Sequence, residues 1–303
     1  MGPKVEKAKA ELRAGDILLL ENLRFLPGET KNDDALARAL AGGIDVYVDD
    51  AFGACHRAHA SIEQITRHVP LAAAGFLLKK EIDYLSMATI DPPRETVVIL
   101  GGAKVSDKIP VINHLLEKAS AVLIGGAMAY TFLKARGVDV GGSRVEDDQI
   151  PTCRELLAKA GKLGVDLRLP VDHIAAVKIE AGITVRMVSA AETIPAEMMG
   201  LDIGFDTVRE YCRIIEGAKL IIWNGPMGVF EVGSFAGGTM EIARAIAGTK
   251  ATSIVGGGDS VAAVHAAGVA EQITHSSTGG GASLEFLAGD KLPGIEALQE
   301  ARP

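Results

Sequence analysis

The stretch TSIVGGGDSVAAV, residues 252–264, decides how the rest of the chain is interpreted. Thr252–Val255 predicts a buried strand, three glycines follow it, and a helix is expected to begin at Asp259 and Ser260. Free backbone N–H groups and the positive end of a helix dipole would converge at the glycines and make an anion site. Asp259 would either cap the helix or help to hold a cation against bound phosphates. Taken alone, the stretch also fits a simple strand-to-helix turn, because it matches neither the P-loop nor the dinucleotide fingerprint.

Length and composition indicate an α/β protein with two domains. The chain has 303 residues, enough for two domains that each bury a sizeable core. Hydrophobic residues make up 48% and aromatic residues 4%, with 35 glycines, as expected for sheets of Val, Ile and Leu joined by glycine turns. The net charge of −8 argues against a protein that binds nucleic acid or a membrane surface, since both need broad basic patches.

The sequence favours a cytoplasmic location. No run of 18 apolar residues occurs, and the first 20 residues mix charges throughout, so neither a membrane span nor a secretory signal is expected. Cys55, Cys153 and Cys212 are odd in number and widely spaced, which predicts neither a disulfide framework nor a zinc site.

From residue 96 onward, strands are expected to alternate with helices. The expected strands are 96–100, 121–124, 166–169, two near 173–178 and 184–188, 219–223 and 252–255. The expected helices are 107–118, 127–136, 147–163, 206–216, 238–247 and 260–267. This alternation predicts a doubly wound, mainly parallel sheet with its ligand site at the carboxyl ends of the strands.

The first 75 residues predict a smaller α/β segment. Ile17–Leu20 is an apolar run that predicts a buried parallel strand, with Arg24 at its carboxyl end, where open sheets bind ligands. A solvated surface position is the competing interpretation of Arg24. Asn32–Asp34 is expected to cap a helix that continues to about Ala41, and Ile44–Val48 predicts a second strand.

The loop after that second strand gathers cations. Its sequence is DDAFGACHRAHAS, residues 49–61, and it contains His56, Arg57 and His59. Such a group suits a phosphate or a carboxylate. A metal site is less favoured, because two histidines three apart in a loop fix no common face and no carboxylate triad completes the ligand set.

Further loops after expected strands suit phosphate binding. They are residues 101–108, 125–127, 223–231 and 276–282. Lys104 and Lys108 are expected in a first helical turn, where the dipole disfavours cations unless an anion shares the site. Gly125 would let a flat group approach the backbone, while Asn224 and Glu231 offer an amide and a carboxylate. One such loop alone is explained as a turn, but several at one edge of a sheet favour a phosphate site.

These motifs resemble a known family. ENLRF, DDAFGACHRAHAS, GGAKVSDK, WNGPMGVFE, GGGDS and STGGGAS occur in the order and spacing of phosphoglycerate kinases, and the resemblance covers essentially the whole chain. It implies two Rossmann-like, doubly wound parallel-sheet domains joined by a helix. It also implies a glycolytic enzyme that transfers a phosphoryl group between ATP and 3-phosphoglycerate, giving ADP and 1,3-bisphosphoglycerate.

The resemblance implies a role for each matching residue. Arg24 and Arg57 would bind the phosphoglycerate. Lys104 would stabilise the phosphoryl group during transfer, with Gly258 and Gly280 at the helix ends that receive phosphate charge. The nucleotide-binding residues would be Lys108, Gly125, Gly126, Asn224, Glu231, Gly257, Gly258, Asp259 and Ser260. Asp259 would hold Mg²⁺ against ATP or ADP, and we expect a monomer that acts on small-molecule substrates.

The domains follow from the same resemblance. Residues 1–75 would be the remnant of the phosphoglycerate-binding domain, 76–92 the interdomain helix and linker, 93–275 the nucleotide-binding domain, and 276–303 a segment returning toward the N-terminal domain. The chain begins where the family has already used roughly a quarter of its length. That part normally supplies the first strands of the N-terminal sheet and the arginine that meets the transferring group. We therefore expect the N-terminal domain to be incomplete and the activity of this chain to be low.

Two alternatives to an active enzyme of this family are considered. One is a truncated Mg-nucleotide-binding module of the same family that is catalytically weak or inactive. The other, a Rossmann dehydrogenase, is disfavoured because no dinucleotide fingerprint follows a strand.

Overall fold

The computed structural model describes residues 2–300 and divides the chain into two compact units. The first unit comprises residues 1–81 and 291–303, and the second comprises residues 82–290. The division falls inside helix α3 (Phe76–Thr89).

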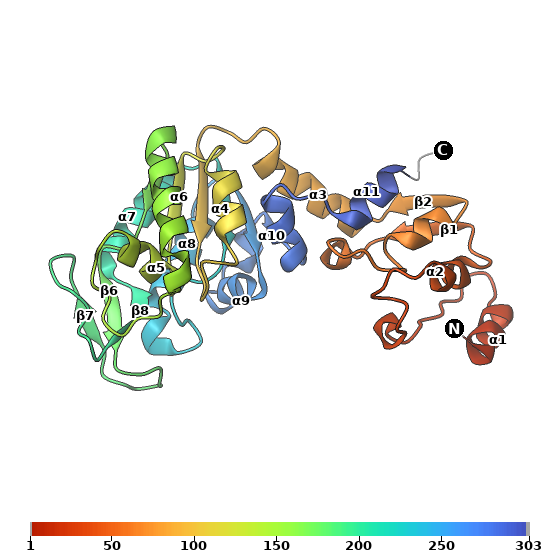
Figure 1. Ribbon diagram of the computed structural model, residues 1–303, viewed down its shortest axis with the longest axis horizontal. Coiled ribbons are helices and arrows are strands. Elements are labelled where there is room, and N and C mark those ends of the chain that lie inside the picture. The colour runs from red at the N-terminus through yellow and green to blue at the C-terminus, as the bar shows by residue number, and fades with distance from the viewer. Residues whose placement is uncertain (1, 301–303) are drawn as a thin grey trace. The chain divides into compact units, whose positions relative to one another are not determined.

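Within the described residues, a six-stranded parallel sheet forms the centre of the second unit (Figure 1). Its strands are β3 (Thr96–Leu100), β4 (Ala121–Ile124), β5 (Asp166–Arg168), β9 (Leu220–Asn224), β10 (Thr252–Gly256) and β11 (His275–Ser276). Their order in space is β11-β10-β9-β3-β4-β5. The chain thus builds outward from β3 in one direction to β5 and in the other to β11. This doubly wound order confirms the predicted α/β class with a Rossmann-like parallel sheet, and it places a crevice where β3 and β9 adjoin.

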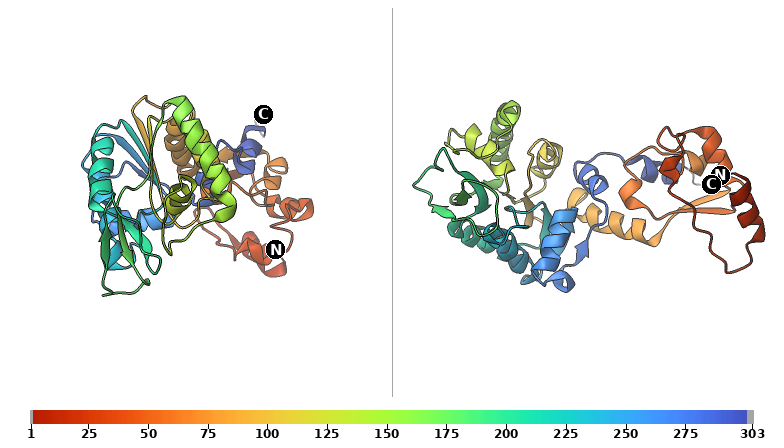
Figure 2. Two further views of the ribbon diagram at one scale, coloured as in Figure 1. Left: turned by 60° about the vertical axis from the view of Figure 1, so that its left-hand side comes forward. Right: turned by 90° about the horizontal axis from the view of Figure 1, so that it is seen from below.

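Helices cover both faces of this sheet. They are α4 (Ile109–Leu115), α5 (Met128–Ala135), α6 (Ile150–Leu163), α7 (Phe205–Glu216), α8 (Gly237–Ala247), α9 (Gly258–Ala266) and α10 (Gly281–Leu287). One layer, which contains α4 and α6, lies on one side of the strands. The other layer, which contains α7, α8 and α9, lies on the opposite side, and both views in Figure 2 show this arrangement. Connections on both faces are what a parallel sheet requires, because each crossover needs a helix.

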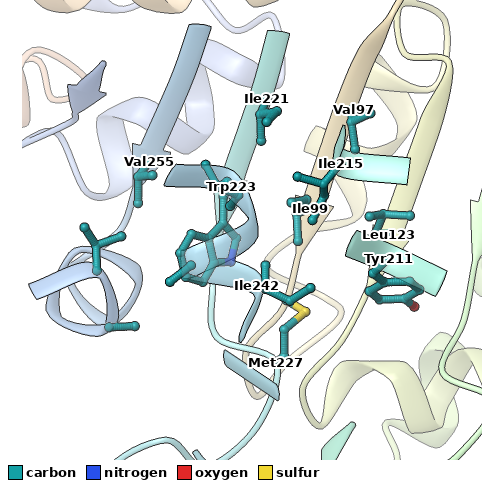
Figure 3. Packing of buried hydrophobic residues seen from close by; sticks show 14 of the residues in the cluster. Val97, Ile99, Leu123, Tyr211, Ile215, Ile221, Trp223, Met227, Ile242 and Val255 are labelled. Carbon is teal, nitrogen blue, oxygen red and sulfur yellow. The ribbon is translucent and has the colours of Figure 1, made fainter. Parts of the chain in front are cut away.

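The core between the sheet and α7 to α9 consists of alternate strand side chains together with side chains of these three helices (Figure 3). Val97 and Ile99 point into this cluster, and Trp223 lies completely buried within it. The indole N–H of Trp223 donates to the carbonyl oxygen of Gly225 at 2.8 Å, and the hydroxyl of Tyr211 donates to that of Ile124 at 2.7 Å. Both large aromatic rings are therefore buried with their polar atoms satisfied.

A small antiparallel sheet in the same unit was only partly predicted. It has the order β7-β6-β8, with β6 (His173–Ala176), β7 (Arg186–Val188) and β8 (Met199–Ile203). Strands near the first two were expected, but β8 was missed because Asp202 interrupts its apolar pattern. The structure buries that carboxylate, which accepts the N–H groups of Gly238 at 2.7 Å and Ile203 at 2.9 Å.

The first unit contains a two-stranded parallel sheet within the described residues. Its elements are α1 (Pro3–Glu11), α2 (Asp34–Ala41), β1 (Val46–Asp49), β2 (Leu71–Ala74), the beginning of α3, and α11 (Pro293–Glu300). Asp33 caps α2 by accepting the N–H of Leu36 at 2.8 Å, as predicted from the Asn-Asp-Asp run. The N–H of Gly294 donates to the carbonyl oxygen of Cys55 at 2.9 Å, which joins α11 to this unit.

The predicted strand at Ile17–Leu20 is wrong. These residues belong to no strand, and the side chains of Ile17 and Leu19 are 93% and 91% exposed. In the described part of the chain, β1 and β2 pair only with each other, so this apolar run has no sheet to join. Arg24 consequently lies in a short 3-10 helix, Leu23–Phe25, rather than at the end of a strand.

Across residues 2–300, no helix combines the length and the apolar character needed to cross a membrane.

Candidate active site

The loops that follow β3 and β9 are bonded to each other at the crevice of the large sheet. The N–H of Gly101 donates to the carbonyl oxygen of Asn224, and that of Gly102 to the carbonyl oxygen of Pro226, both at 3.0 Å. A Cβ on Gly101 would lie 2.0 Å from the carbonyl oxygen of Pro226. Glycine is therefore required where the two loops cross.

A cavity of about 340 Å³ lies at these strand ends. It is lined by Lys104, Asp107, Lys108, Asn224, Gly225, Gly257, Gly258, Asp259, Ser260, Gly280 and Leu284, together with residues 101–103 and Pro226. These residues come from the loops after β3, β9, β10 and β11. The structure thus brings together all the predicted catalytic residues and most of the predicted nucleotide-binding residues.

Lys108 and Asn224 form a buried pair on the floor of this cavity. The ammonium group of Lys108 donates to the Oδ1 atom of Asn224, and the two residues are only 9% and 3% exposed. Burial lowers the pKa of Lys108 to about 8, against the opposing charges of Asp107 and Asp259. The Nδ2 atom of Asn224 is buried without a hydrogen-bond partner among residues 2–300. A buried unpaired donor beside a lysine calls for an acceptor from a bound ligand.

Lys104 is exposed and precedes the helix, which corrects the predicted start of that helix at residue 107. Helix α4 begins at Ile109, and Lys108 occupies its N-cap position. The two lysines therefore do not share a helix face. Both nevertheless line the same cavity.

The first turn of α9 borders the same cavity. Gly257 occupies the N-cap position with φ 88°, a left-handed conformation that favours glycine. Asp259 lies inside the first turn, so the alternative that it caps the helix is wrong. Ser260 is buried, and its hydroxyl oxygen accepts the N–H of Gly225 at 2.6 Å. That contact fixes the position of α9 against the loop after β9.

A second cavity of about 270 Å³ adjoins the first, because Gly102, Ala103, Pro226 and Asp259 line both. Its other lining residues are Gly126, Ala127, Arg144, Ile179, Met199, Gly200, Leu201, Gly228, Val229 and Glu231. Mostly apolar walls with the carboxylates of Glu231 and Asp259 suit a flat ring that carries hydroxyl groups. Gly125 lies beside this cavity rather than in its wall, and a Cβ there would lie 2.4 Å from the Sδ atom of Met227.

Sequence reasoning missed the part of this wall that β8 supplies. Met199, Gly200 and Leu201 line the second cavity, and the N–H of Val229 donates to the carbonyl oxygen of Leu201 at 2.9 Å. The available signal was the alternation of Met199, Leu201 and Ile203 with Gly200 and Asp202. Arg144 was also missed, since it lies in a loop that follows no strand.

The predicted cations of the first unit lie in the same neighbourhood within that unit. Burial lowers the pKa of His59, Glu29 raises it, and the positive charges of Arg24, Arg57 and His56 lower it further. Arg24 and Arg57 are exposed, and the Nε atom of Arg57 donates to the Nε2 atom of His56 at 3.1 Å. An anion would find exposed positive charge at this surface.

The donor set at the first cavity fits magnesium carried by a nucleotide. Asp259 and Asp107 present exposed carboxylates to a cavity that two lysines also line. No group of three or more His, Cys, Asp or Glu side chains within residues 2–300 is arranged to hold a metal ion. Mg²⁺ typically uses one or two carboxylates and takes its remaining ligands from phosphates and water.

Comparisons with known proteins agree with this geometry. A family model described as phosphoglycerate kinase matches residues 1–290. The phosphoglycerate kinase of Koribacter versatilis is 55% identical over 299 residues, 98% of this chain and 74% of that protein. That of Moorella thermoacetica is 55% identical over 300 residues, 99% of this chain and 76% of that protein.

Solved structures give the same result. The phosphoglycerate kinase of Coxiella burnetii is similar with a TM-score of 0.90 and 39% identity, covering 95% of this chain and 74% of that one. That of Pyrococcus horikoshii has a TM-score of 0.87 and 35% identity, covering 99% of this chain and 76% of that one.

Proposed function

The chain belongs to the phosphoglycerate kinase family, and from that premise we propose that it transfers a phosphoryl group reversibly between ATP and 3-phosphoglycerate. The products are ADP and 1,3-bisphosphoglycerate. The observation that carries the proposal is the pair of adjoining cavities at the strand ends, one polar with two lysines and one mostly apolar with a carboxylate. A nucleotide has the matching halves, its phosphates and its base with ribose.

The nucleotide phosphates occupy the first cavity in this proposal. Lys108 supplies positive charge, and the unpaired Nδ2 atom of Asn224 donates to a phosphate oxygen. The first turn of α9, from Gly257 through Gly258 to Ser260, adds backbone N–H groups and the positive end of its dipole. These are fixed donors, which need no rearrangement when the phosphate arrives.

The base and ribose occupy the second cavity. Gly126 borders the base from the cavity wall, and Gly125 lies beside that wall. A Cβ at Gly126 would lie 2.5 Å from the backbone nitrogen of Gly102, and one at Gly125 would lie 2.4 Å from the Sδ atom of Met227. Glu231 accepts hydrogen bonds from the ribose hydroxyls. Asp259 lines both cavities and holds Mg²⁺ beside the phosphates. The ion, when bound, neutralises charge that develops on the phosphate oxygens.

Lys104 acts on the group in transfer. A carboxylate oxygen of 3-phosphoglycerate attacks the γ-phosphorus of ATP, the bond to the β–γ bridging oxygen breaks, and ADP leaves. The ammonium of Lys104 and the backbone at Gly258 and Gly280 stabilise the charge on the moving phosphoryl group. Arg24 and Arg57 hold the phosphate of 3-phosphoglycerate. We further propose a cytoplasmic monomer.

A coupled assay that consumes 1,3-bisphosphoglycerate tests this function. We expect product formation that requires ATP, Mg²⁺ and 3-phosphoglycerate together. Lys104→Ala should lower kcat about 10²- to 10³-fold, because it removes a fixed charge aimed at the transition state. Lys134→Ala is the matched control, since Lys134 is an exposed lysine in the last turn of α5 and lines neither cavity.

Two results would contradict the proposal. One is no product above background from the unmodified chain at saturating substrates. The other is equal kcat in Lys104→Ala and Lys134→Ala, which would show that the cavity lysine takes no part in the reaction.

A further inference from the structure

Glu146 reaches from a distant part of the sequence into the loop that contains both cavity lysines. Its Oε2 atom accepts the N–H of Val105 at 2.5 Å and that of Ser106 at 3.3 Å. Its Oε1 atom accepts the hydroxyl of Ser106 at 2.7 Å. One carboxylate therefore holds three donors in the short segment between Lys104 and Lys108.

Glu146 is itself anchored to the body of the second unit. Its backbone N–H donates to the hydroxyl oxygen of Thr131 at 3.1 Å, and Thr131 is buried in α5. Helices α5 and α6 pack together on either side of the loop that carries Glu146. The position of the carboxylate is thus anchored to α5. Partial burial raises the pKa of Glu146, but the hydrogen bonds that it accepts from Ser106 and Val105 outweigh burial and lower the pKa overall.

The loop that Glu146 holds is also bonded at its two ends, where the N–H of Gly102 donates to the carbonyl oxygen of Pro226 and the ammonium of Lys108 donates to Asn224. Glu146 supplies side-chain hydrogen bonds to the segment between these ends. Gly102 has φ 107°, and no side chain among residues 2–300 caps α4. Val105 is completely buried, and its carbonyl oxygen accepts the N–H groups of Lys108 at 2.8 Å and Ile109 at 3.0 Å. A continuous series of hydrogen bonds therefore runs from Glu146 through Val105 to the backbone of Lys108.

We propose that Glu146 is a positioning residue for nucleotide phosphates, which sets the backbone that places Lys104 and Lys108 in the cavity. The inference rests on the proposed function in one respect, namely that this cavity takes phosphates. Glu146 lines neither cavity and so acts through the loop rather than on the ligand. Losing it should weaken ligands that carry phosphates and leave adenosine, which lacks them, unaffected.

The test compares ADP with adenosine on the full chain, by calorimetry for Mg-ADP and by NMR titration for adenosine. Glu146→Ala should weaken Mg-ADP about tenfold or more, since it removes charge-assisted hydrogen bonds. Glu146→Gln keeps one acceptor and should lose less, and Ser106→Ala, which removes only the hydroxyl contact, less again. The dissociation constant for adenosine should stay unchanged in all three.

Hydrogen exchange without any nucleotide supplies the second readout. The amides of residues 103–108 should exchange faster in Glu146→Ala than in the unmodified chain, and those of β9 and β10 should not change. The exchange measurement tests the role of Glu146 in positioning the loop even if the cavity binds no nucleotide. Absence of nucleotide binding would contradict the proposed function instead.

Asp172→Ala is the matched control. The carboxylate of Asp172 holds three donors at the start of α7, the N–H groups of Asp206 at 2.9 Å and Thr207 at 2.8 Å and the hydroxyl of Thr207 at 2.6 Å. It lines neither cavity. We expect Asp172→Ala to lower the melting temperature and to leave the affinity for ADP unchanged. The inference is overturned if Glu146→Ala binds ADP like the unmodified chain, if adenosine weakens in parallel with ADP, or if exchange at 103–108 does not change.

Discussion

Lys108 shows how the environment of a single residue could prepare the proposed phosphate site. Its ammonium is buried, its partner Asn224 is neutral, and the carboxylates of Asp107 and Asp259 compensate burial only in part. The result is a pKa of about 8, below the ordinary value of 10.5. An anion that binds beside it favours the charged form and raises this pKa.

The affinity for ADP should therefore depend on pH in a defined direction. Because the complex has the higher pKa, binding takes up a proton at pH values between the two pKas. Affinity should be highest below pH 8 and fall as pH rises further, approaching tenfold per pH unit. Calorimetric titrations from pH 7 to pH 9.5 measure the slope. Lys108→Arg cannot lose its charge in this range and is the control. A flat profile in the unmodified chain, or an equal slope in Lys108→Arg, would show that Lys108 is not the titrating group.

Alanine substitutions at two glycines should change the free energy of unfolding in opposite directions, because one glycine is required by close packing and the other is not. Gly101→Ala should destabilise the chain by about 1–3 kcal/mol, because its Cβ would strike the backbone of Pro226 and force the two loops apart. Gly161→Ala in α6 meets no atom within 4 Å and should stabilise by roughly 0.5–1 kcal/mol. Urea unfolding of both variants gives the comparison. Opposite signs are expected, and a neutral Gly101→Ala would refute the close crossing of the loops.

At the scale of elements, the central strands could be predicted from the sequence and the peripheral ones could not. β3 and β4 have the predicted bounds, because uninterrupted apolar runs are typical of strands buried on both faces. Ile17–Leu20 has the same kind of pattern, but a strand exists only where a neighbour pairs with it. β8 was missed for the opposite reason, since its buried Asp202 is partly satisfied by the N–H of Gly238, which is remote in sequence.

The candidate site was predictable where its residues follow strands. Lys104, Lys108, Asn224 and Asp259 were found because the carboxyl ends of parallel strands meet at one edge. The contact between Glu146 and Val105 joins residues 41 apart, and no local pattern indicates it. The same holds for the buried pair of Lys108 and Asn224, which are 116 residues apart.

The two-stranded sheet of the first unit should be less protected than the large sheet. Val46 and Val48 are 49% and 54% exposed on β1, and Leu71 is 46% exposed on β2, whereas every residue of β3 is buried. Isolated strand pairs are marginally stable in water. Native-state hydrogen exchange should show faster exchange in β1 and β2 than in β3, β9 and β10. Equal protection would mean that another surface covers the exposed valines in solution.

At the scale of the whole molecule, the proposed nucleotide site lies entirely within the second unit. The residues that line both cavities fall between Gly101 and Leu284, inside the unit of residues 82–290. Arg24 and Arg57 belong to the first unit. Nucleotide binding should therefore be a property of the second unit, while the proposed turnover should also need Arg24 and Arg57 of the first unit.

Titration calorimetry of the chain with ADP in the presence of Mg²⁺ tests the central claim most directly. We predict saturable binding at one site per chain that weakens in Asp259→Asn when Mg²⁺ is present, because Asp259 is the proposed ligand of the ion. Binding at a hundredfold excess over the dissociation constant should also stabilise the fold by about 2.7 kcal/mol. Absence of any binding heat and of any stabilisation at millimolar Mg-ADP would contradict the assignment of the two cavities to a nucleotide.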